Sequence, residues 1–385
     1  MSHIEIILED LTEHPKCPHG PTILFSRITN GKRTNFFACS ACRDRKDCSF
    51  YLCASEKRKV SDVKKKEWEL GIRNYTKGIK HQKLFLLLNE IQQLPENMRT
   101  YCNTCQQFVY FKFKQKHEGH QIKQNLSDYH LRHPSEILLP LDNPKKEAQY
   151  LFSKIAVDTI IDIVRQKNIK NVLCIGAPRL HECIESVHDD MSSLMLDIDK
   201  RYHSFFGPLE FCWYNMFNHH FFFEESKEVF LDFIRNGGKD LCIIMDPPFG
   251  GRIELLAQTI NSINALNKKI NNVSSNIPIL FIFPYFMEPQ ILNSFSDFVM
   301  LDYKIDYDNH MLFREGPKGR KQGSPVRIFT NINPNSIILP ESQGYKHCRK
   351  CDRWVSIENR HCNFCNSCTS KTEGLMFIVM YAADA

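Results

Sequence analysis

The sequence has no apolar run long enough to cross a membrane. Its longest run covers residues 277–287 and contains Pro278 and Pro284, so it is well short of the roughly 20 residues that a spanning helix needs. It also lacks the basic start and small-residue cleavage site of a secretory signal, because Glu5, Glu9 and Asp10 lie near the N-terminus. We therefore expect a soluble protein of the cytosol or nucleus, with no membrane partner.

Internal repeats and long low-complexity tracts are absent as well. With 385 residues, 42% apolar and 24% charged, the chain can bury one full-sized core and still carry smaller modules, so we expect two to four domains. Cysteine, by contrast, is plentiful. The 16 cysteines cluster with histidines at two-residue spacings, which in a reducing compartment favours zinc sites over disulfides.

Positive charge is concentrated in one segment. The whole chain carries a formal net charge of +6, whereas residues 57–83 alone hold ten Lys/Arg against three acidic residues, a local excess of +7. Such a run is typical either of a solvated helix face or of a surface that follows nucleic-acid phosphates. In the second case, Trp68 and Tyr75 could stack on unpaired bases.

The composition divides the chain into distinct parts. Residues 16–53 and 101–120 are rich in cysteine and histidine, and a short amphipathic helix is expected between them at 84–94. From about residue 149, a helix is predicted at 150–167 and strands are predicted at 171–175, 194–196, 241–245, 279–283, 299–305 and 326–331. This alternation predicts an α/β domain with a mainly parallel sheet, whose last two strands form an antiparallel pair.

A proline-rich loop directly follows the buried-strand pattern at 241–245. Its sequence is Asp246-Pro247-Pro248-Phe249-Gly250-Gly251. Ligands of an open α/β sheet bind beyond the carboxyl ends of its strands, so the position suits a catalytic loop. The two prolines fix the backbone, and the glycines let the chain turn before a helix that begins near Arg252. A turn that merely ends a strand is the alternative.

The residue types of this loop fit the methylation of an exocyclic amine. Such an amine is a poor nucleophile because its lone pair is delocalised into the ring. A carboxylate and a carbonyl that accept its hydrogen bonds favour the pyramidal, attacking form, and Asp246 and the Pro247 carbonyl could supply them. Phe249 would then stack on the base and hold the nitrogen in line with the methyl group.

Over about residues 149–335, the loop and its surroundings resemble the amino-methyltransferases that carry an Asp/Asn-Pro-Pro-aromatic signature. The resemblance implies a Rossmann-like, seven-stranded methyltransferase core that binds S-adenosylmethionine. It also implies that Gln149, Tyr150 and Phe152 lie near this cofactor.

Two acidic residues and a glycine-poor loop complete the expected cofactor site. Asp197 ends a predicted strand 21 residues after Gly176 and is the candidate for the ribose hydroxyls, with Asp199 as its close rival. The loop Gly176-Ala177-Pro178 has one glycine where this fold usually has two or three, so a plain surface loop is the alternative. Asn215 could border the adenine pocket, although the aromatic residues after it are equally typical of core packing.

Three clusters have the spacing of zinc ligands, because paired ligands two residues apart can form the tight knuckle that meets a tetrahedral zinc ion. The first lies within residues 17–50, and phenylalanines flank its cysteines. It resembles the GRF-type zinc finger, a module associated with single-stranded nucleic acid. The match implies the ligands Cys17, His19, Cys39 and Cys48, and Cys42 is the local alternative.

The second cluster resembles a Cys2His2 site. Its four ligands, Cys102, Cys105, His117 and His120, lie within nineteen residues, with eleven residues between the two pairs. The spacing between the histidines is shorter than in most fingers that read a DNA groove. A structural role and RNA contact are therefore equally open.

The third cluster resembles the cysteine-rich region of DHHC palmitoyltransferases, but it lacks the Asp-His-His-Cys tetrad and every membrane helix. An acyltransferase is therefore excluded. The interleaved pattern of that region implies a zinc site made of Cys348, Cys351, His361 and Cys368. Cys362 and Cys365 would need two further ligands downstream, and none follows, so we expect the second site of this pattern to be incomplete.

The order of these parts resembles the ribosomal RNA adenine-N6 methyltransferases of the zinc finger CCHC-domain family, supported by residues 38–48, 214–222 and 324–331. The resemblance implies N6-methylation of an unpaired or loop adenosine in large-subunit ribosomal RNA. It implies a location in the nucleus or nucleolus, with the cytoplasm as a further location. The CCHC knuckle that names the family is missing from this sequence.

The expected domains follow from these parts. They are a GRF-type finger at 1–56, a basic linker with a helix at 57–100, a Cys2His2 module at 101–133, a methyltransferase domain at 134–340 and a partial DHHC-like segment at 341–385, with about three zinc ions. A non-catalytic RNA-binding zinc protein that has kept the fold is one alternative function. A protein glutamine N5-methyltransferase is another, although its loop usually begins with Asn rather than Asp. The sequence does not identify a protein partner.

Overall fold

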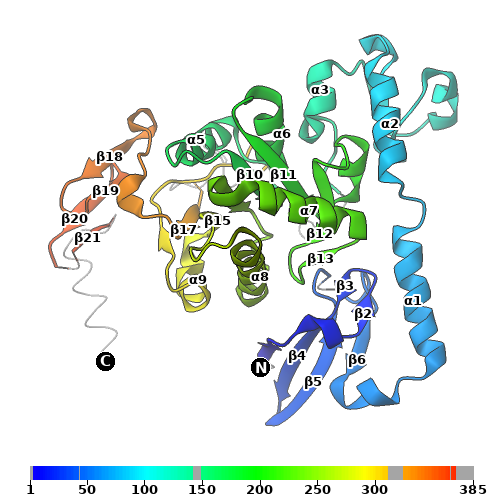
Figure 1. The fold of residues 1–385 in the computed structure, drawn as a ribbon, viewed down its shortest axis with the longest axis horizontal. Helices are drawn as coiled ribbons and strands as arrows, with labels where there is room; N and C mark the ends of the chain where they lie inside the picture. Colours follow the sequence, from blue (N-terminus) through cyan, green and yellow to red (C-terminus); the bar gives the residue numbers. More distant parts are fainter. Residues whose placement is uncertain (1–2, 43, 142–148, 311–323, 365, 370–385) are drawn as a thin grey trace.

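The computed structural model describes residues 3–42, 44–141, 149–310, 324–364 and 366–369. Its centre is a sheet in the order β13-β12-β11-β10-β14-β15-β17-β16 (Figure 1). The strands are β10 (Asn171–Ile175), β11 (Ser192–Asp197), β12 (Phe211–Asn215), β13 (His220–Phe221), β14 (Leu241–Met245), β15 (Ile279–Pro284), β16 (Val299–Met300) and β17 (Val326–Thr330). Neighbours from β12 to β15 pair in parallel, and β13, β16 and β17 pair antiparallel.

The predicted α/β fold is confirmed. Seven of these strands form the expected core sheet, and the two-residue β13 adds a short eighth strand at one edge. Helices α5 (Lys154–Arg165) and α6 (Pro178–Val187) pack on one face of the sheet, and α7 (Glu224–Gly237), α8 (Ile253–Asn271) and α9 (Glu288–Ser294) pack on the other. Each face has its own apolar core, so the strands between them are buried on both sides.

The ranges of individual elements were predicted with unequal success. Strands β10 and β14 have the predicted bounds, because each is a continuous run that the two helix layers bury. The helix predicted at 150–167 begins only at Lys154, because Ser153 accepts a hydrogen bond from the Ala156 amide and acts as its N-cap. The strand predicted at 299–305 ends at Met300, and beyond it only single backbone hydrogen bonds reach β17.

Three Cys/His modules surround this core. The first (residues 3–53) contains the sheet β1-β4-β5-β6 and the hairpin β2-β3; the second (100–124) contains β8-β7-β9; the third (345–369) contains the hairpins β18-β19 and β20-β21. Their bounds are β1 (His3–Ile7), β2 (Lys16–Cys17), β3 (Gly20–Pro21), β4 (Ile23–Thr29), β5 (Lys32–Ala38), β6 (Tyr51–Cys53), β7 (Thr100–Cys102), β8 (Gln107–Phe108), β9 (Ile122–Gln124), β18 (Tyr345–Cys348), β19 (Arg353–Ser356), β20 (Arg360–Cys362) and β21 (Ser367–Thr369).

Helices α1 (Asp62–Thr76) and α2 (His81–Gln92) connect the first module to the second along one side of the molecule (Figure 1). The short α3 (Asp128–Arg132) then leads into the catalytic domain. The third module lies at the opposite end, beyond β17 (Figure 1). None of the helices in the described ranges combines the length and the apolarity needed to span a bilayer.

Candidate active site

The expected cofactor loop and the expected catalytic loop begin side by side. Strands β10 and β14 are parallel neighbours, with Ile175 paired to Met245. Immediately after this pair, the Asp246 amide donates a hydrogen bond to the Ile175 carbonyl at 3.0 Å. Gly176 and Asp246 therefore lie next to each other at the carboxyl edge of the sheet, where ligands of this fold class bind.

The one glycine of the cofactor loop occupies the position where the backbone requires it. Gly176 has φ +68°, and a Cβ at this residue would lie 2.8 Å from the Asp246 carbonyl oxygen and 3.0 Å from Met216 Cε. The following residues need no such freedom, because Ala177 precedes α6 with φ −127° and Pro178 lies in its first turn. A single glycine is thus enough for this loop to turn against Asp246.

Asp246 has a buried partner that the sequence did not reveal. The Tyr307 hydroxyl donates a hydrogen bond to Asp246 Oδ1 at 3.0 Å, and Tyr307 itself is fully buried. Burial raises the pKa of Asp246 well above its ordinary value, and the hydrogen bond from Tyr307 lowers it in part. Burial also raises the pKa of Tyr307, so this hydroxyl stays protonated and remains a donor. The pair therefore holds a carboxyl group with a raised pKa in a fixed position.

Aromatic rings surround Phe249. The ring of Tyr150 is nearly parallel to it, with centroids 6.2 Å apart at 25°. Tyr307 and Phe283 meet Phe249 edge-on, at 6.0 Å and 6.1 Å. Phe152 also packs against this group, because its ring lies 5.2 Å from that of Tyr307 and the two residues form a β-bridge. The orientation of Phe249 is therefore fixed, as a base-stacking residue requires.

The two acidic candidates of the cofactor site differ in what already binds them. Asp199 is 7% exposed and forms an ion pair with Arg201 at 2.6 Å. It also accepts a hydrogen bond from Gln149 Nε2 at 2.8 Å. Asp197, at the end of β11, accepts a hydrogen bond from the Asp199 amide. Burial and then the charge of Asp199 raise the pKa of Asp197 to about 7. This arrangement favours Asp197 over Asp199 for contact with a ligand.

Gln149 holds this acidic pair together. Its Oε1 accepts hydrogen bonds from Arg201 at 3.2 Å and from the Leu141 amide at 3.1 Å, while its Nε2 binds Asp199. Both the oxygen and the nitrogen of the Gln149 side-chain amide thus bind protein groups beside Asp199, and its place near the cofactor stays a prediction. Its contribution there is to orient Asp199.

Asn215 makes contacts that the sequence analysis did not anticipate. Its side chain is completely buried, and Nδ2 donates hydrogen bonds to the His19 carbonyl and to Ser40 Oγ, both at 2.9 Å. Its Oδ1 accepts a hydrogen bond from the Phe217 amide at 3.1 Å. The amide that we expected at an adenine pocket is thus committed to the first Cys/His module. The neighbouring Met216, rather than Asn215, contacts the cofactor loop at Gly176.

The first module brings together the four residues implied by its resemblance. The ligand atoms of Cys17, His19, Cys39 and Cys48 all lie within 4.8 Å of one another, and all four residues are buried. The alternative residue, Cys42, lies just outside this group, with Sγ 3.7 Å from His19 Nε2. Three thiols and one imidazole in this arrangement could hold a zinc ion tetrahedrally.

The same module is firmly attached to the catalytic domain. Asn218 Nδ2 donates hydrogen bonds to the carbonyls of His19 at 3.0 Å and Pro21 at 2.8 Å. Between them, Gly20 has φ +98°, and a Cβ there would lie 2.4 Å from the His220 ring. The backbone of β3 is therefore pressed against the turn between β12 and β13.

Helix α1 contributes two aromatic rings to this contact. Tyr75 lies 4.8 Å from the His19 ring and stacks at 5.3 Å on Trp213, a buried residue of β12. Trp68 packs against Phe50 of the first module at 4.7 Å. Both residues are half-buried, so the structure gives Trp68 and Tyr75 a packing role, and their stacking on bases stays a prediction.

The basic side chains of residues 57–83 nevertheless lie at the surface. No residue of α1 is buried. Lys65 and Arg73 form exposed i,i+3 and i,i+4 ion pairs with Asp62 and Glu69, and such pairs contribute little to stability. Helix α1 itself has four basic and three acidic residues, so most of the positive excess of residues 57–83 lies in the exposed residues that flank it, where it is accessible to a polyanion.

The second module brings its four expected ligands together as well. The ligand atoms of Cys102, Cys105, His117 and His120 lie within 4.8 Å of one another. The module rests on the catalytic domain through Tyr101, whose ring lies 4.9 Å from that of Phe205.

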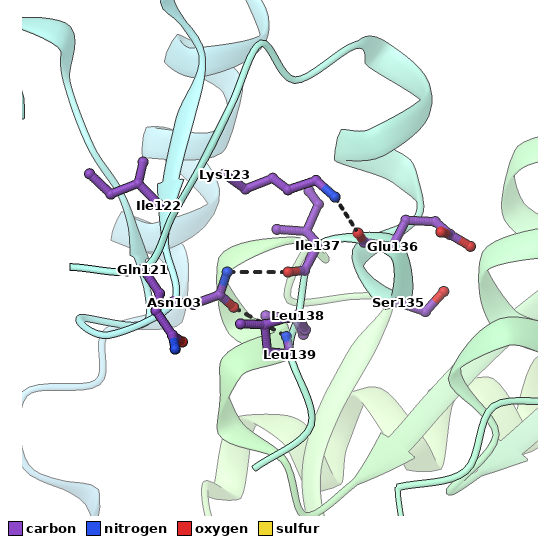
Figure 2. Close-up of a pocket in the computed structure, with 9 residues that line it drawn as sticks. All are labelled: Asn103, Gln121, Ile122, Lys123, Ser135, Glu136, Ile137, Leu138 and Leu139. Atoms are coloured by element: carbon purple, nitrogen blue, oxygen red, sulfur yellow. Dashed lines mark hydrogen bonds between the residues drawn. The ribbon is translucent and has the colours of Figure 1, made fainter. Parts of the chain in front are cut away.

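A cavity of about 540 Å³ lies where the second module meets residues 135–139 (Figure 2). Asn103 crosses it with hydrogen bonds to the backbone of Ile137 and Leu139, and Lys123 Nζ donates to the Glu136 carbonyl (Figure 2). Neither Asp246 nor Phe249 lines this cavity. It therefore belongs to the attachment of the module rather than to the catalytic loop.

The third module gathers Cys348, Cys351, His361 and Cys368, with ligand atoms again within 4.8 Å of one another, and these four residues are partly exposed. Cys362 is buried in β20 but is outside this group. Cys365, its expected companion, lies outside the described residues. The structure thus supports one candidate metal site in this module.

Comparison with known proteins gives two consistent results. Residues 143–331 match a family described as probable N6-adenine methyltransferase. The chain is 43% identical over 384 residues to the human rRNA N(6)-adenosine-methyltransferase ZCCHC4, covering 96% of this chain and 74% of that protein. It is 44% identical to the mouse protein of the same name, covering 90% and 70%, and 43% identical to the one from Xenopus tropicalis, covering 93% and 76%.

Proposed function

The chain belongs to the rRNA N(6)-adenosine-methyltransferase family, and from this premise we propose how its residues carry out the reaction. The protein is an S-adenosylmethionine-dependent enzyme that methylates adenine in ribosomal RNA. The observation that carries the assignment of its active site is the part-buried Asp246–Tyr307 hydrogen bond at the end of β14. It holds a carboxyl group of raised pKa where the fold binds ligands.

In this proposal Asp246 and the Pro247 carbonyl accept the two N–H hydrogen bonds of the adenine amine. Phe249 stacks on the base. When bound, S-adenosylmethionine supplies an electrophilic methyl group on its sulfonium sulfur. As the amine nitrogen forms its bond to carbon, it loses a proton, and Asp246 is the nearest proposed acceptor. Its raised pKa suits it to take that proton and later release it to solvent.

The residues around Gly176 fit the cofactor. Gly176 leaves room that a Cβ would fill, and Asp197 is available at the end of β11, next to the cofactor loop. We propose that Asp197 binds the ribose hydroxyls and that the backbone of Gly176, Ala177 and Pro178 borders the amino-acid part of the ligand. Tyr150 and Phe152 are proposed to shape the pocket through Phe249 and Tyr307.

We propose one structural zinc ion in each of the three Cys/His modules. The support is the same in each case, namely four thiol or imidazole ligands whose atoms lie within 4.8 Å of one another. Four such ligands leave no open position for a substrate, which is typical of structural rather than catalytic zinc.

The finer identity of the substrate is also a proposal. We propose an unpaired or loop adenosine of large-subunit ribosomal RNA, because Phe249 can stack only on a base that has left its helix. The exposed lysines of α1 are proposed to follow the RNA backbone. The nucleus, and within it the nucleolus where ribosomal RNA is made, is the proposed location, with the cytoplasm as a second one.

The central test measures transfer of labelled methyl from S-adenosylmethionine to ribosomal RNA fragments. Asp246→Ala should lower kcat by at least about 100-fold, since it removes both a hydrogen-bond acceptor and the proton acceptor. Its cofactor affinity, measured by calorimetry, should change little. Equal labelling of adenine by the variant and the native chain would show that the loop assignment is wrong.

A matched variant, Tyr307→Phe, removes only the hydroxyl group beside Asp246. Because the lost hydrogen bond had lowered the Asp246 pKa, that pKa should rise further. The acid limb of the pH–rate profile should therefore move to higher pH, while activity above it is retained. A profile that does not move would contradict a catalytic role for ionised Asp246.

The same assay separates the alternative functions. A non-catalytic RNA-binding protein would bind the RNA fragments but neither bind cofactor nor transfer label. A protein glutamine methyltransferase would place the label on protein rather than on RNA.

A further inference from the structure

Two large aromatic side chains lie exposed directly after β15, at the same edge of the sheet as the catalytic loop. Tyr285 is 45% exposed and Phe286 is 58% exposed, and their ring centroids lie 5.8 Å apart at 75°. Both belong to a short 3-10 helix, Tyr285–Met287. Exposed aromatic side chains beside a catalytic loop suggest a surface that receives a ligand.

The register of the sheet sets the distance of this pair from the catalytic carboxyl group. Met245 of β14 is paired with Phe281 of β15, so Asp246 is level with Ile282. Tyr285 lies three residues further along the strand direction, or roughly 10 Å at about 3.3 Å per residue. That separation is suited to a nucleotide beside the target base rather than to the target base itself.

A guanidinium group lies against the first of these rings. Arg327 Cζ is 5.7 Å from the centroid of the Tyr285 ring. Arg327 is anchored by hydrogen bonds from its Nη1 to the carbonyls of Ser324 at 2.8 Å and Val326 at 2.9 Å. Among the described residues, no carboxylate forms an ion pair with it. The charges of Asp302 and Asp306 lie near enough to offset part of its own, and the guanidinium supports the ring chiefly through its cation–π contact.

The backbone beneath the pair is fixed before any ligand arrives. The Tyr285 amide donates a hydrogen bond to the Pro325 carbonyl at 2.9 Å. Pro284 precedes the pair, and Pro289 lies in the first turn of α9. A ligand that stacks here would thus order little of the protein, which lowers the entropic cost of binding.

We propose that Tyr285 and Phe286 form a stacking platform for the unpaired nucleotide next to the target adenosine, with Arg327 supporting the Tyr285 ring. The inference rests on the proposed function, because it extends the same active site along its RNA. In the sheet order, the catalytic loop lies between the first module at β12 and this platform at β15. The RNA strand therefore leaves the target base toward β15. A protein ligand is disfavoured because specific protein interfaces bury about 1,600 Å², far more than two rings offer.

The experiment compares Tyr285→Ala and Phe286→Ala with the native chain in methyl transfer to ribosomal RNA fragments. Each should raise KM for RNA about ten-fold, the order expected for loss of one base–aromatic stack. The turnover number at saturating RNA and the affinity for S-adenosylmethionine should stay within about two-fold, because the platform contacts neither the amine nor the cofactor. Tyr285→Phe keeps the aromatic ring and should have the same KM for RNA as the native chain. Leu209→Ala, another exposed apolar position, is the matched control and should match the native chain.

A second arm changes the RNA. Two fragments are used, with an abasic nucleotide on one side or on the other side of the labelled adenosine. Both should raise KM for the native chain. One of them should cause no further rise in KM for Tyr285→Ala, because the stacking partner of its missing base is already absent. Equal KM values for Tyr285→Ala and the native chain, or an equal abasic penalty in both, would overturn the platform and leave the rings to a protein partner.

Failure of the proposed function has a different signature. In that case the native chain transfers no label to RNA at all. The platform is then judged by fluorescence anisotropy with the same fragments, in which Tyr285→Ala must bind about ten-fold more weakly. Thermal unfolding of each variant shows whether it is folded, and Tyr285→Phe separates loss of the ring from loss of structure.

Discussion

The first and third Cys/His modules have ligand sets of the same kind but opposite relations to the catalytic domain. In the first, all four candidate ligands are buried, and Asn215 and Asn218 bind the backbone carbonyl of one of them, His19. In the third, all four are partly exposed. Its contacts with the catalytic domain include Asp302, which accepts hydrogen bonds from the Ser356 amide and from Asn359, and the Lys304 amide, which donates to the Tyr345 hydroxyl.

This difference separates a module that supports the active site from one that is attached at its margin. The segment bound by the first module includes Met216, which touches Gly176 of the cofactor loop. The third module meets the catalytic domain after β16, where Tyr345 packs on Tyr303 at 5.4 Å. The same metal chemistry should therefore matter to catalysis in one place and mainly to local folding in the other.

The largest effect is expected from removing one ligand in each module. Structural zinc contributes about 10–16 kcal/mol of binding free energy that supports local folding. Cys17→Ala should therefore unfold the first module, release the β12–β13 turn and lower S-adenosylmethionine affinity at least about ten-fold. Cys351→Ala should lose zinc equally but leave that affinity within about two-fold.

Zinc content by mass spectrometry and cofactor binding by calorimetry measure the two effects separately. Cys53→Ser, at a partly exposed cysteine outside the ligand group, is the control and should retain both metal and affinity. Equal loss of cofactor affinity in both ligand variants would remove the distinction between the modules.

A smaller effect is expected from a matched pair of glycines, Gly20 and Gly344. Both have positive φ, +98° and +83°, but a Cβ at Gly20 would lie 2.4 Å from the His220 ring, whereas at Gly344 the nearest atom is 3.8 Å away. Gly344→Ala should cost about 1–2 kcal/mol from backbone strain alone. Gly20→Ala adds overpacking of about 1–3 kcal/mol. Chemical denaturation gives both values, and equal values would mean that the first module is not closely packed against β13.

The smallest effect is expected from two asparagines that join the modules to the core. Asn218 is 5% exposed and donates to two backbone carbonyls. Asn218→Ala removes the side-chain donor to the part-buried Pro21 carbonyl, while the His19 carbonyl keeps its hydrogen bond from Asn215, and it should cost about 1–3 kcal/mol. Asn359 donates to Asp302, which is itself partly exposed and can bind water instead. Asn359→Ala should therefore cost less than about 1 kcal/mol. The reverse order in thermal unfolding would contradict the comparison.

The sequence was most informative where the causes of structure are local. The bounds of β10 and β14 followed from continuous apolar runs, and the three ligand groups followed from ligand spacing and resemblance. Gly176 could be singled out because it is the single glycine of a loop that follows a predicted strand, and the structure gives it a positive φ beside Asp246.

Contacts between distant segments could not be predicted in this way. Tyr307 binds Asp246 across 61 residues, and the only local signal was the buried alternation Leu301, Tyr303, Ile305, Tyr307, which indicates burial but names no partner. Likewise, Asn215 binds a carbonyl 196 residues away. Nothing in its neighbourhood distinguishes an amide that faces a cofactor from one that holds a zinc module.

Three of the four hydrogen bonds that the amides of Asn215 and Asn218 donate to the first module end on main-chain oxygens of residues 19 and 21, and the fourth ends on Ser40 Oγ. A peptide carbonyl is chemically the same whichever residue carries it, so these hydrogen bonds require little of the finger's sequence beyond a glycine at position 20 and a hydroxyl group at position 40. A finger from another protein with the same chain path could therefore be grafted onto this enzyme. The solvent-facing surface of the finger could then be replaced in such a chimaera without any change to the catalytic domain.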